Sequence, residues 1–318
     1  MNTLLLYTKL YGMLRNYGMP YWIMTPIRRI VRNLANWYLP QYLARPAETK
    51  CLHNDNLIVS LTSFPDRIDD VWKVIESLKR QTVRPGKIIL WLSSEQFPDK
   101  GQMPSSLLSL EDSLFKIRFV SGDFRSHKKY YYTLREYPEK TIITCDDDIY
   151  YDVDMIKRLV DASKRYPNCI ISNYASKIKH SKDGKLLPYL QWPSNVDAYD
   201  SEDLLQIGAG GVLYPPHSLH DLVLDSDVFM NLCPSADDIW LNAMARLNST
   251  PVVKSAKKVQ LLPIVNRSPS LNSVNNGEIN LNDTQIGQLR NYLISNNLED
   301  VYSSKCNVKS NYGGFISC

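Results

Sequence analysis

Two short runs of aspartates are the residues in this chain best suited to chemistry. The first, Asp146-Asp147-Asp148, directly follows the apolar segment Thr141–Cys145. Three adjacent carboxylates repel one another, so a bound cation would stabilise them. In a strand-like geometry alternate side chains share a face, which points Asp146 and Asp148 the same way. Such a pair suits Mg²⁺ or Mn²⁺ on a diphosphate; a solvated acidic turn is the alternative.

The second run, Asp237-Asp238, precedes an apolar segment that is typical of a helix and begins at Ile239. Acidic side chains stabilise the N-terminus of a helix, so capping alone explains them. A carboxylate in this place could also serve as the general base for an incoming hydroxyl. The residues by themselves leave both explanations open.

Two further segments have the composition of a ligand-binding loop. The first, Ser60–Arg67, combines hydroxyls with an arginine that could hold a nucleotide, although it could equally be a turn that caps the next helix. The second, Gly208–Gly211, lets the backbone approach a ligand closely. Neither the G-x-G-x-x-G spacing nor a P-loop occurs, so a Rossmann dinucleotide site and a P-loop kinase are not supported.

The elements that must position these residues alternate between strands and helices. The pattern predicts an α/β fold with a mainly parallel sheet covered on both faces. Such sheets bind ligands at the carboxyl ends of their strands, where the polar clusters lie. The expected strands are 57–62, 87–92 (after a turn at Pro85-Gly86), 116–120 and 141–145, and the expected helices are 68–82, 128–137 and 153–166.

Five motifs in this order resemble the nucleotide-sugar glycosyltransferases of GT-A fold. They are most similar to the bacterial family-2-like enzymes that build capsular and other surface polysaccharides, and the resemblance covers about residues 56–250. The motifs are Leu61–Ile68, Ser77–Pro85 with the strand after it, His127–Tyr130 leading to Asp146–Asp148, Gly210–Pro216, and Ala236–Leu241. The resemblance implies a single GT-A domain that uses Mn²⁺ or Mg²⁺ and a nucleotide-sugar donor, with a uridine diphosphate sugar favoured.

The resemblance also implies a role for individual residues. Asp146 contacts the donor's ribose, and Asp148 binds the cation with help from Asp147; Asp146 is the second predicted metal ligand. Asp238 is the base of an inverting displacement, and Asp237 orients either this base or the acceptor. The predicted donor pocket further contains Thr62, Ser63, Arg67 and Lys129, and the predicted acceptor site contains Gly210, Gly211 and Trp240. No histidine follows His220, so the late metal-binding histidine of many relatives is missing.

Other classes of function stay open with less support. A nucleotidyl- or phosphotransferase would use the same acidic metal site, but it would not need the separate Asp237-Asp238 motif. A non-catalytic carbohydrate- or membrane-binding protein would need neither motif. Nucleic-acid binding is disfavoured because the body of the chain is slightly acidic and its basic residues do not form a broad patch.

The charge is distributed unevenly along the chain. Residues 1–50 hold seven basic side chains and one acid, although the whole chain has 37 Lys and Arg against 33 Asp and Glu. Within this segment, Thr25 as N-cap, Pro26 and Pro40 predict a helix over 25–39. Its stripe of Ile27, Ile30, Val31, Leu34 and Tyr38, with arginines beside it, favours an anchor at an anionic membrane surface through residues 1–45. Packing of the stripe on the protein's own core is the alternative.

These features divide the chain into three parts. We expect a basic helical leader (1–50), a catalytic domain (51–265) and a polar C-terminal tail (266–318) that could cover the donor as a lid.

The six cysteines are widely spaced, which favours free thiols in a reducing compartment. With no apolar run long enough to span a bilayer, we expect a cytoplasmic protein, peripheral at the inner face of the plasma membrane. The acceptor would be a glycan or a lipid-linked glycan.

Overall fold

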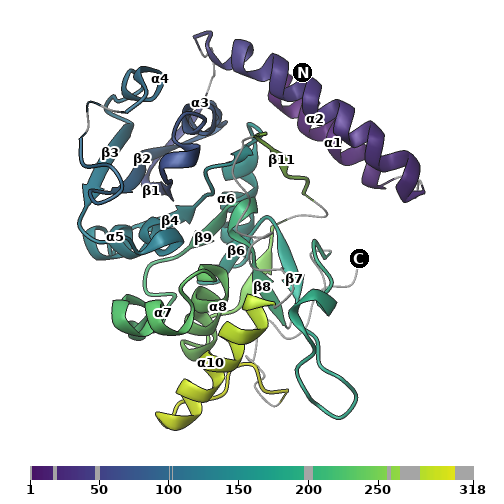
Figure 1. Cartoon of the computed structure of the whole chain (residues 1–318), viewed down its shortest axis with the longest axis vertical. Coiled ribbons are helices and arrows are strands. Elements are labelled where there is room, and N and C mark those ends of the chain that lie inside the picture. Colours follow the sequence, from purple (N-terminus) through teal and green to yellow (C-terminus); the bar gives the residue numbers. More distant parts are fainter. Residues whose placement is uncertain are drawn as a thin grey trace.

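The computed structural model describes residues 2–16, 20–46, 51–99, 101, 103–196, 203–255, 259–265 and 280–304. Its centre is a seven-stranded sheet in the order β10-β6-β9-β4-β1-β2-β3 (Figure 1). Only β9 (Val212–Tyr214) opposes its neighbours β4 and β6, so the other described strands of the sheet run in one direction. The predicted α/β fold with a mainly parallel central sheet is therefore confirmed. The other strands are β1 (Leu52–Thr62), β2 (Val83–Ser93), β3 (Phe115–Val120), β4 (Thr141–Thr144), β6 (Ile170–Ser172) and β10 (Val252–Lys254).

Helices cover both faces of this sheet. Alternate residues of β1 point to opposite faces, so Leu57, Val59 and Leu61 join one apolar cluster, whereas Ile58 joins another. Burial on both sides explains the continuous apolar runs Leu57–Val59 of β1 and Ile88–Leu92 of β2. One face is covered by α3 (Val71–Lys79) and α6 (Met155–Arg165); the other carries α5 (Lys128–Glu136), and α7 (Ser226–Leu232), α8 (Asp237–Leu247) and α10 (Leu281–Ser295) pack beyond it.

Two small ribbons extend from the sheet towards the site. In one, β5 (Ile149–Tyr150) pairs with β11 (Leu262–Pro263); in the other, β7 (Ala175–Lys177) pairs with β8 (Leu204–Gln206). The short helix α4 (Ser105–Leu108) lies near the edge strand β3, and a 3-10 turn, Pro65–Arg67, follows β1.

The expected turn at Pro85-Gly86 is wrong, because both residues lie inside β2. Pro85 is aligned with Asn54 of β1, and the pairing register shifts between Asn54 and Ile58. A Cβ on Gly86 would come within 2.9 Å of the Asp55 backbone, so only glycine allows the two strands to approach here. The strands therefore extend well beyond the apolar segments from which they were predicted.

The N-terminal segment forms two helices that lie side by side at one edge of the molecule (Figure 1). They are α1 (Thr3–Asn16), which the sequence reading missed, and α2 (Tyr21–Leu43). The prediction of a helix limited to 25–39 is wrong, because α2 continues through Pro26 and Pro40. Leu39 and Leu43 are buried in the core, and this tertiary packing outweighs the hydrogen bond that Pro40 cannot make. No helix among the described residues has the length and apolar character that a membrane span requires.

Val301 and Tyr302, among the last described residues, pack on α8. The Tyr302 hydroxyl donates to the Ile239 carbonyl at 3.0 Å, and the Arg246 Nε donates to the Val301 carbonyl at 2.7 Å. The residues 266–279 of the predicted lid lie outside the described residues. Asn280 caps α10 by accepting hydrogen bonds from the backbone N–H groups of Asn282 and Asp283.

Candidate active site

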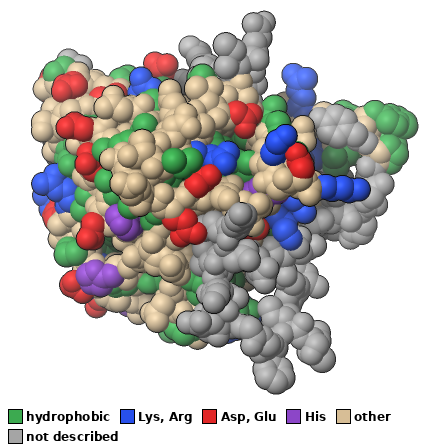
Figure 2. Space-filling model, turned by 90° about the horizontal axis from the view of Figure 1, so that it is seen from below, with side chains coloured by type: hydrophobic (Ala, Val, Ile, Leu, Met, Phe, Trp, Pro, Cys, Tyr) green, Lys and Arg blue, Asp and Glu red, His purple; other side chains and the backbone are tan. Residues whose placement is uncertain are grey.

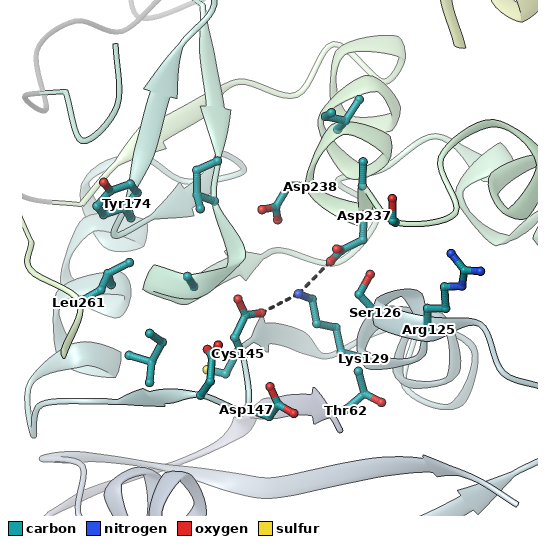
Figure 3. Close-up of a pocket in the computed structure, with 18 of the residues that line it drawn as sticks. Thr62, Arg125, Ser126, Lys129, Cys145, Asp147, Tyr174, Asp237, Asp238 and Leu261 are labelled. Carbon is teal, nitrogen blue, oxygen red and sulfur yellow. Dashed lines mark hydrogen bonds and ion pairs between the residues drawn. The ribbon is translucent and has the colours of Figure 1, made fainter. Parts of the chain in front are cut away.

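A cavity of about 830 Å³ lies at the carboxyl ends of β1 and β4. It is lined from one side by the segments after these strands and by α5, and from the other by the start of α8 (Figure 3). The third side is formed by Leu261 and Pro263 around β11. All of the predicted donor, metal and catalytic residues line it: Thr62, Ser63, Arg67, Lys129, Asp146, Asp147, Asp148, Asp237 and Asp238.

The first aspartate run lies in a bend after β4 rather than in a strand. Asp147 accepts a hydrogen bond from Ser63 at 2.5 Å and pairs with Arg67 at 2.7 Å. The same Arg67 Nη1 lies 2.9 Å from Asp148. The strand geometry on which that expectation was based is therefore absent. Asp147 and Asp148 share Arg67, Asp146 pairs with Lys129 at 2.8 Å, and all three carboxylates line the cavity.

This run carries more negative charge than its arginine offsets. Burial and the neighbouring Asp146 raise the pKa of Asp148 to about 6. Burial also raises the pKa of Asp147, although Arg67 opposes this shift. A site that raises carboxylate pKa values in this way favours a bound cation.

Lys129 of α5 connects the two aspartate runs. Its Nζ lies 2.8 Å from Asp146 and 2.8 Å from Asp237, and only 5% of its side chain is exposed. Burial lowers the pKa of Lys129, but the aspartates outweigh this and hold it well above the ordinary value. The lysine is therefore a fixed positive charge between a strand end and a helix start, as Figure 3 shows.

The pKa values of the two aspartates at the start of α8 are shifted in opposite directions. Asp237 is buried, which alone would raise its pKa, but Lys129 pulls the pKa below the ordinary value. Asp238 accepts hydrogen bonds from the Gly208 N–H at 3.0 and 3.1 Å. Burial and the charge of Asp237 raise its pKa to about 8. Of the two, Asp238 is the one poised to exchange a proton near neutral pH.

Gly208 is a site residue that the sequence reading did not single out from its loop. A Cβ at this position would lie 3.0 Å from the Lys129 Nζ, 3.1 Å from Asp238 Oδ1 and 3.4 Å from Asp146 Oδ1. Three candidate site side chains thus converge on a point where a larger residue would be crowded. Its place in the run Gly208–Gly211 was the available signal.

The residues predicted to bind the acceptor lie behind the cavity rather than in its lining. Trp240 is fully buried in the core with α7 and α8. Gly210 is held against Tyr174, and Gly211 adopts a φ of +82° against Met155. Ile207 and Ala209 of the same loop line the cavity instead. Gly210 and Gly211 therefore support the loop from behind, whereas Trp240 packs in the core against Phe229.

An aromatic wall opposite Lys129 was not predicted. Tyr174, Tyr189, Leu190 and Trp192 line the cavity on the side of Asp238. The rings of Tyr189 and Trp192 lie 5.2 Å apart, and burial and Asp238 raise the pKa of the Tyr189 hydroxyl. Aromatic faces beside a carboxylate suit a sugar ring with its hydroxyl directed at that carboxylate. The signal was the density of aromatic residues at 189–192, far along the chain from either aspartate run.

The donor set fits a divalent cation held jointly with a substrate. Within the described part of the chain, no three His, Cys, Asp or Glu side chains converge as a complete metal site. Asp146 and Asp148 would offer hard oxygen ligands, and burial together with the charge of Asp146 raises the pKa of Asp148, a shift that a cation would oppose. Diphosphate oxygens and water would have to complete the coordination.

Comparisons with known proteins add similarity at the level of structure alone. No protein-family model and no curated protein matches the chain. It is similar to S. aureus TarS 1–349 in complex with UDP, with 13% identity over 74% of this chain and 70% of that one, and a TM-score of 0.44. It is also similar to 4-diphosphocytidyl-2C-methyl-D-erythritol synthase from Anaerococcus prevotii, with 13% identity over 66% and 90% of the two chains and a TM-score of 0.38.

A third similar structure is the mannosyltransferase PcManGT from Pyrobaculum calidifontis in complex with GDP-Man and Mn²⁺. Here the identity is 10% over 53% of this chain and 45% of that one, with a TM-score of 0.29. Because identities and scores are this low, any assignment of activity has to come from the residues of the chain itself.

Proposed function

We propose that the protein is a metal-dependent glycosyltransferase that moves a sugar from a nucleoside-diphosphate sugar, UDP-sugar favoured, to a hydroxyl of an acceptor. The observation that carries the proposal is the arrangement around Lys129. This lysine pairs with Asp146 at the donor side and Asp237 at the acceptor side, 2.8 Å from each. Asp238 lies beside it with a raised pKa. A cation-binding side thus faces a separate base across one cavity.

At the donor side, we assign the nucleotide to the segments after β1 and β4. Thr62, Ser63 and Arg67 line the cavity here with the first aspartate run. Asp146 and Asp148 would hold the divalent cation, which supplies charge neutralisation to the diphosphate leaving group. Arg67 and Lys129 keep fixed positive charges beside these carboxylates. Preorganised charges of this kind stabilise the negative charge that develops as the sugar leaves.

At the acceptor side, we assign the sugar ring to the aromatic wall and the reacting hydroxyl to Asp238. Asp238 takes the hydroxyl proton as the acceptor oxygen forms a bond to the anomeric carbon. The bond from that carbon to the diphosphate oxygen breaks, and its electron pair leaves with the nucleoside diphosphate. Attack opposite the leaving group inverts the anomeric configuration. The Gly208 N–H and Lys129 hold Asp238 and its neighbour Asp237 in place.

The finer parts of the proposal concern the pathway. We propose that the acceptor is a glycan or a lipid-linked glycan in the synthesis of a surface polysaccharide, and that the enzyme works in the cytoplasm at the inner face of the plasma membrane. A cavity of about 830 Å³ is large enough for a nucleotide sugar and part of an acceptor. No nucleic-acid partner is proposed.

The test is a panel of nucleotide sugars with and without Mn²⁺, read by released nucleoside diphosphate. We expect one donor class to release it with metal and not with a chelator, even without acceptor, because water can replace the acceptor slowly. The competing nucleotidyltransferase would instead release pyrophosphate from a nucleoside triphosphate and a sugar phosphate. Pyrophosphate release, or binding of sugars without any turnover, would overturn the proposal.

A further inference from the structure

An apolar stripe on α2 is exposed although it contains two tryptophans. The exposed fractions are 75% for Trp22, 57% for Ile30, 51% for Leu34 and 68% for Trp37. At 100° per residue these positions lie within one arc of the helix, opposite the buried face of Ala35, Leu39 and Leu43. This exposed stripe differs from the predicted one, because Ile27, Val31 and Tyr38 are half-buried. Large apolar side chains gathered in this way mark a docking surface.

The charge of the two helices indicates what docks there. Residues 1–47 contain six basic side chains and no acid, whereas the remaining residues hold 31 basic and 33 acidic ones. Arg29 and Lys9 are exposed. Figure 2 shows hydrophobic and basic side chains together at the right-hand end of the molecule, the side of α1 and α2 in Figure 1. Tryptophans beside cations complement an anionic lipid surface.

The helices are fixed to the wall of the cavity. The Asn36 Nδ2 donates to the Pro263 carbonyl at 3.0 Å, and the Val265 N–H donates to Asn36 Oδ1 at 2.8 Å. Pro263 lines the cavity, and the next N–H, of Ile264, donates to the Asp148 carbonyl at 2.7 Å. Asn36 and the segment around β11 thus connect the helix of the exposed stripe to the backbone of Asp148, a candidate metal ligand.

Close packing supports the same attachment on α1. A Cβ on Gly12 would lie 2.2 Å from the Gln260 Cγ, so the segment before β11 crosses α1 only because residue 12 is glycine. Between the two helices, the Arg28 guanidinium of α2 lies 4.1 Å from the centre of the Tyr11 ring of α1. The two helices therefore have a fixed position relative to the site.

We propose that α1 and α2 form a docking surface for an anionic lipid bilayer, in which Trp22, Ile30, Leu34 and Trp37 enter the interface. Through Asn36 and β11, docking holds the cavity at a fixed short distance from the bilayer. If the proposed function is right, acceptors carried on lipids in the interface are the class that this arrangement serves. Docking itself does not depend on that function.

The test compares two matched double variants in vesicle sedimentation. Trp22→Ser/Trp37→Ser removes the stripe's tryptophans, and Leu52→Ser/Ile294→Ser removes two side chains that are 73% and 58% exposed elsewhere. With vesicles of 30% phosphatidylglycerol in phosphatidylcholine, we expect the tryptophan variant to bind at least about tenfold more weakly than the wild type. The control variant should bind as the wild type does, and pure phosphatidylcholine should bind the wild type weakly. All four side chains are exposed, so both variants should keep the wild-type melting temperature.

A second readout reports the contact directly. Brominated lipid in the same vesicles should quench part of the wild-type tryptophan fluorescence and none of that of the Trp22→Ser/Trp37→Ser variant. Equal sedimentation of the wild type and the tryptophan variant would overturn the proposal. So would a wild-type dimer in light scattering that the tryptophan variant abolishes, because the stripe would then be an interface between two copies. Neither measurement uses a sugar donor, so failure here is distinct from failure of the proposed activity.

Discussion

The run Asp146–Asp148 lies in a bend after β4, the run Asp237-Asp238 begins α8, and the two meet at Lys129. In the first run, Arg67 is shared by two carboxylates, and the pKa of Asp148 is raised to about 6. In the second, the lysine keeps Asp237 ionised, while burial and Asp237 raise the pKa of Asp238 to about 8.

The difference shows how similar residues acquire different chemistry. The first run has one arginine for two carboxylates and shares its lysine with the second run, so it suits an added cation. In the second run Lys129 pairs with Asp237 and leaves Asp238 with a high proton affinity. Pairs of carboxylates whose pKa values are pushed apart are a recurring basis for assigning acid and base roles.

Removing the shared cation should have the largest effect. Lys129→Met leaves a buried Asp237 without its partner, so we expect a loss of about 3–5 kcal/mol in the free energy of unfolding. Urea denaturation measures it. Lys157→Met, which breaks the pair with Asp161 that is about half-exposed, is the matched control and should change stability by less than about 0.5 kcal/mol. Adding Asp237→Asn to Lys129→Met should restore part of the loss; no recovery would mean that Asp237 is not the carboxylate that Lys129 stabilises.

Removing the base should stop transfer and spare donor binding. Asp238→Asn is expected to lower the turnover of donor with acceptor by about 10²–10⁴-fold, because it cannot take the hydroxyl proton. Nucleoside diphosphate affinity, measured by calorimetry, should stay within about twofold of the wild type. Asp225→Asn, an aspartate that caps α7, is the control for a helix-capping role. If both variants lose only stability, capping explains the second run as well.

Weakening the first run should change metal dependence instead. Asp148→Asn is expected to raise the Mn²⁺ concentration for half-maximal turnover by about tenfold or more, because a hard anionic ligand is lost. It should also abolish the rise in melting temperature that Mn²⁺ with a nucleoside diphosphate produces in the wild type. Asp161→Asn, on the surface of α6, should leave both unchanged. An unaltered Mn²⁺ response in Asp148→Asn would refute the metal assignment.

The pH dependence distinguishes the second run from ordinary surface aspartates. Because Asp238 must be ionised to act, kcat/KM should rise with pH along a limb near 8 rather than near 4. Asp237→Asn removes the neighbouring negative charge, so the limb should move to lower pH. Because folding raises the pKa of Asp238, the protonated carboxyl stabilises the folded state at low pH. This contribution is complete below the unfolded pKa and is lost as the pH rises towards 8. Asp238→Asn should therefore flatten the decline of stability between about pH 4 and 8, and an unchanged slope would contradict the raised pKa.

The smallest expected effect is at the point where the two runs come together. Gly208→Ala places a Cβ 3.0 Å from Lys129 and 3.1 Å from Asp238, so these side chains must shift by a few tenths of an ångström. We expect about a tenfold loss in kcat/KM, since small displacements of reacting groups are costly. Gly287→Ala in α10 meets nothing within 4 Å and should instead stabilise the protein by about 0.4–1 kcal/mol. Equal activity of both variants would show that the convergence at Gly208 does not matter for catalysis.

Local patterns predicted much of the fold and part of the site. Apolar runs ending in polar clusters predicted the mainly parallel sheet, and these patterns singled out Arg67 and both aspartate runs, which line the cavity. Lys129 was singled out by the family resemblance alone. The extension of β2 through Pro85-Gly86 and of α2 through Pro26 and Pro40 could not be predicted, because packing partners distant in the chain override local breakers. The burial of Trp240 could not be predicted either. Its ring lies in the core, although the preceding residues Asp238 and Ile239 line the cavity.

What the sequence by itself determined is the chemistry that is available: two aspartate runs, a glycine loop, and basic helices without acids. These follow from residue type and from short-range spacing. Only the tertiary structure decided which side chains act on one another, because pKa values and exposure depend on groups brought together from distant segments. Lys129 reaches Asp237, separated by 108 positions, and Asn36 reaches Pro263, separated by 227. The roles of the two aspartate runs, and the face of α2 that remains exposed, follow from those contacts.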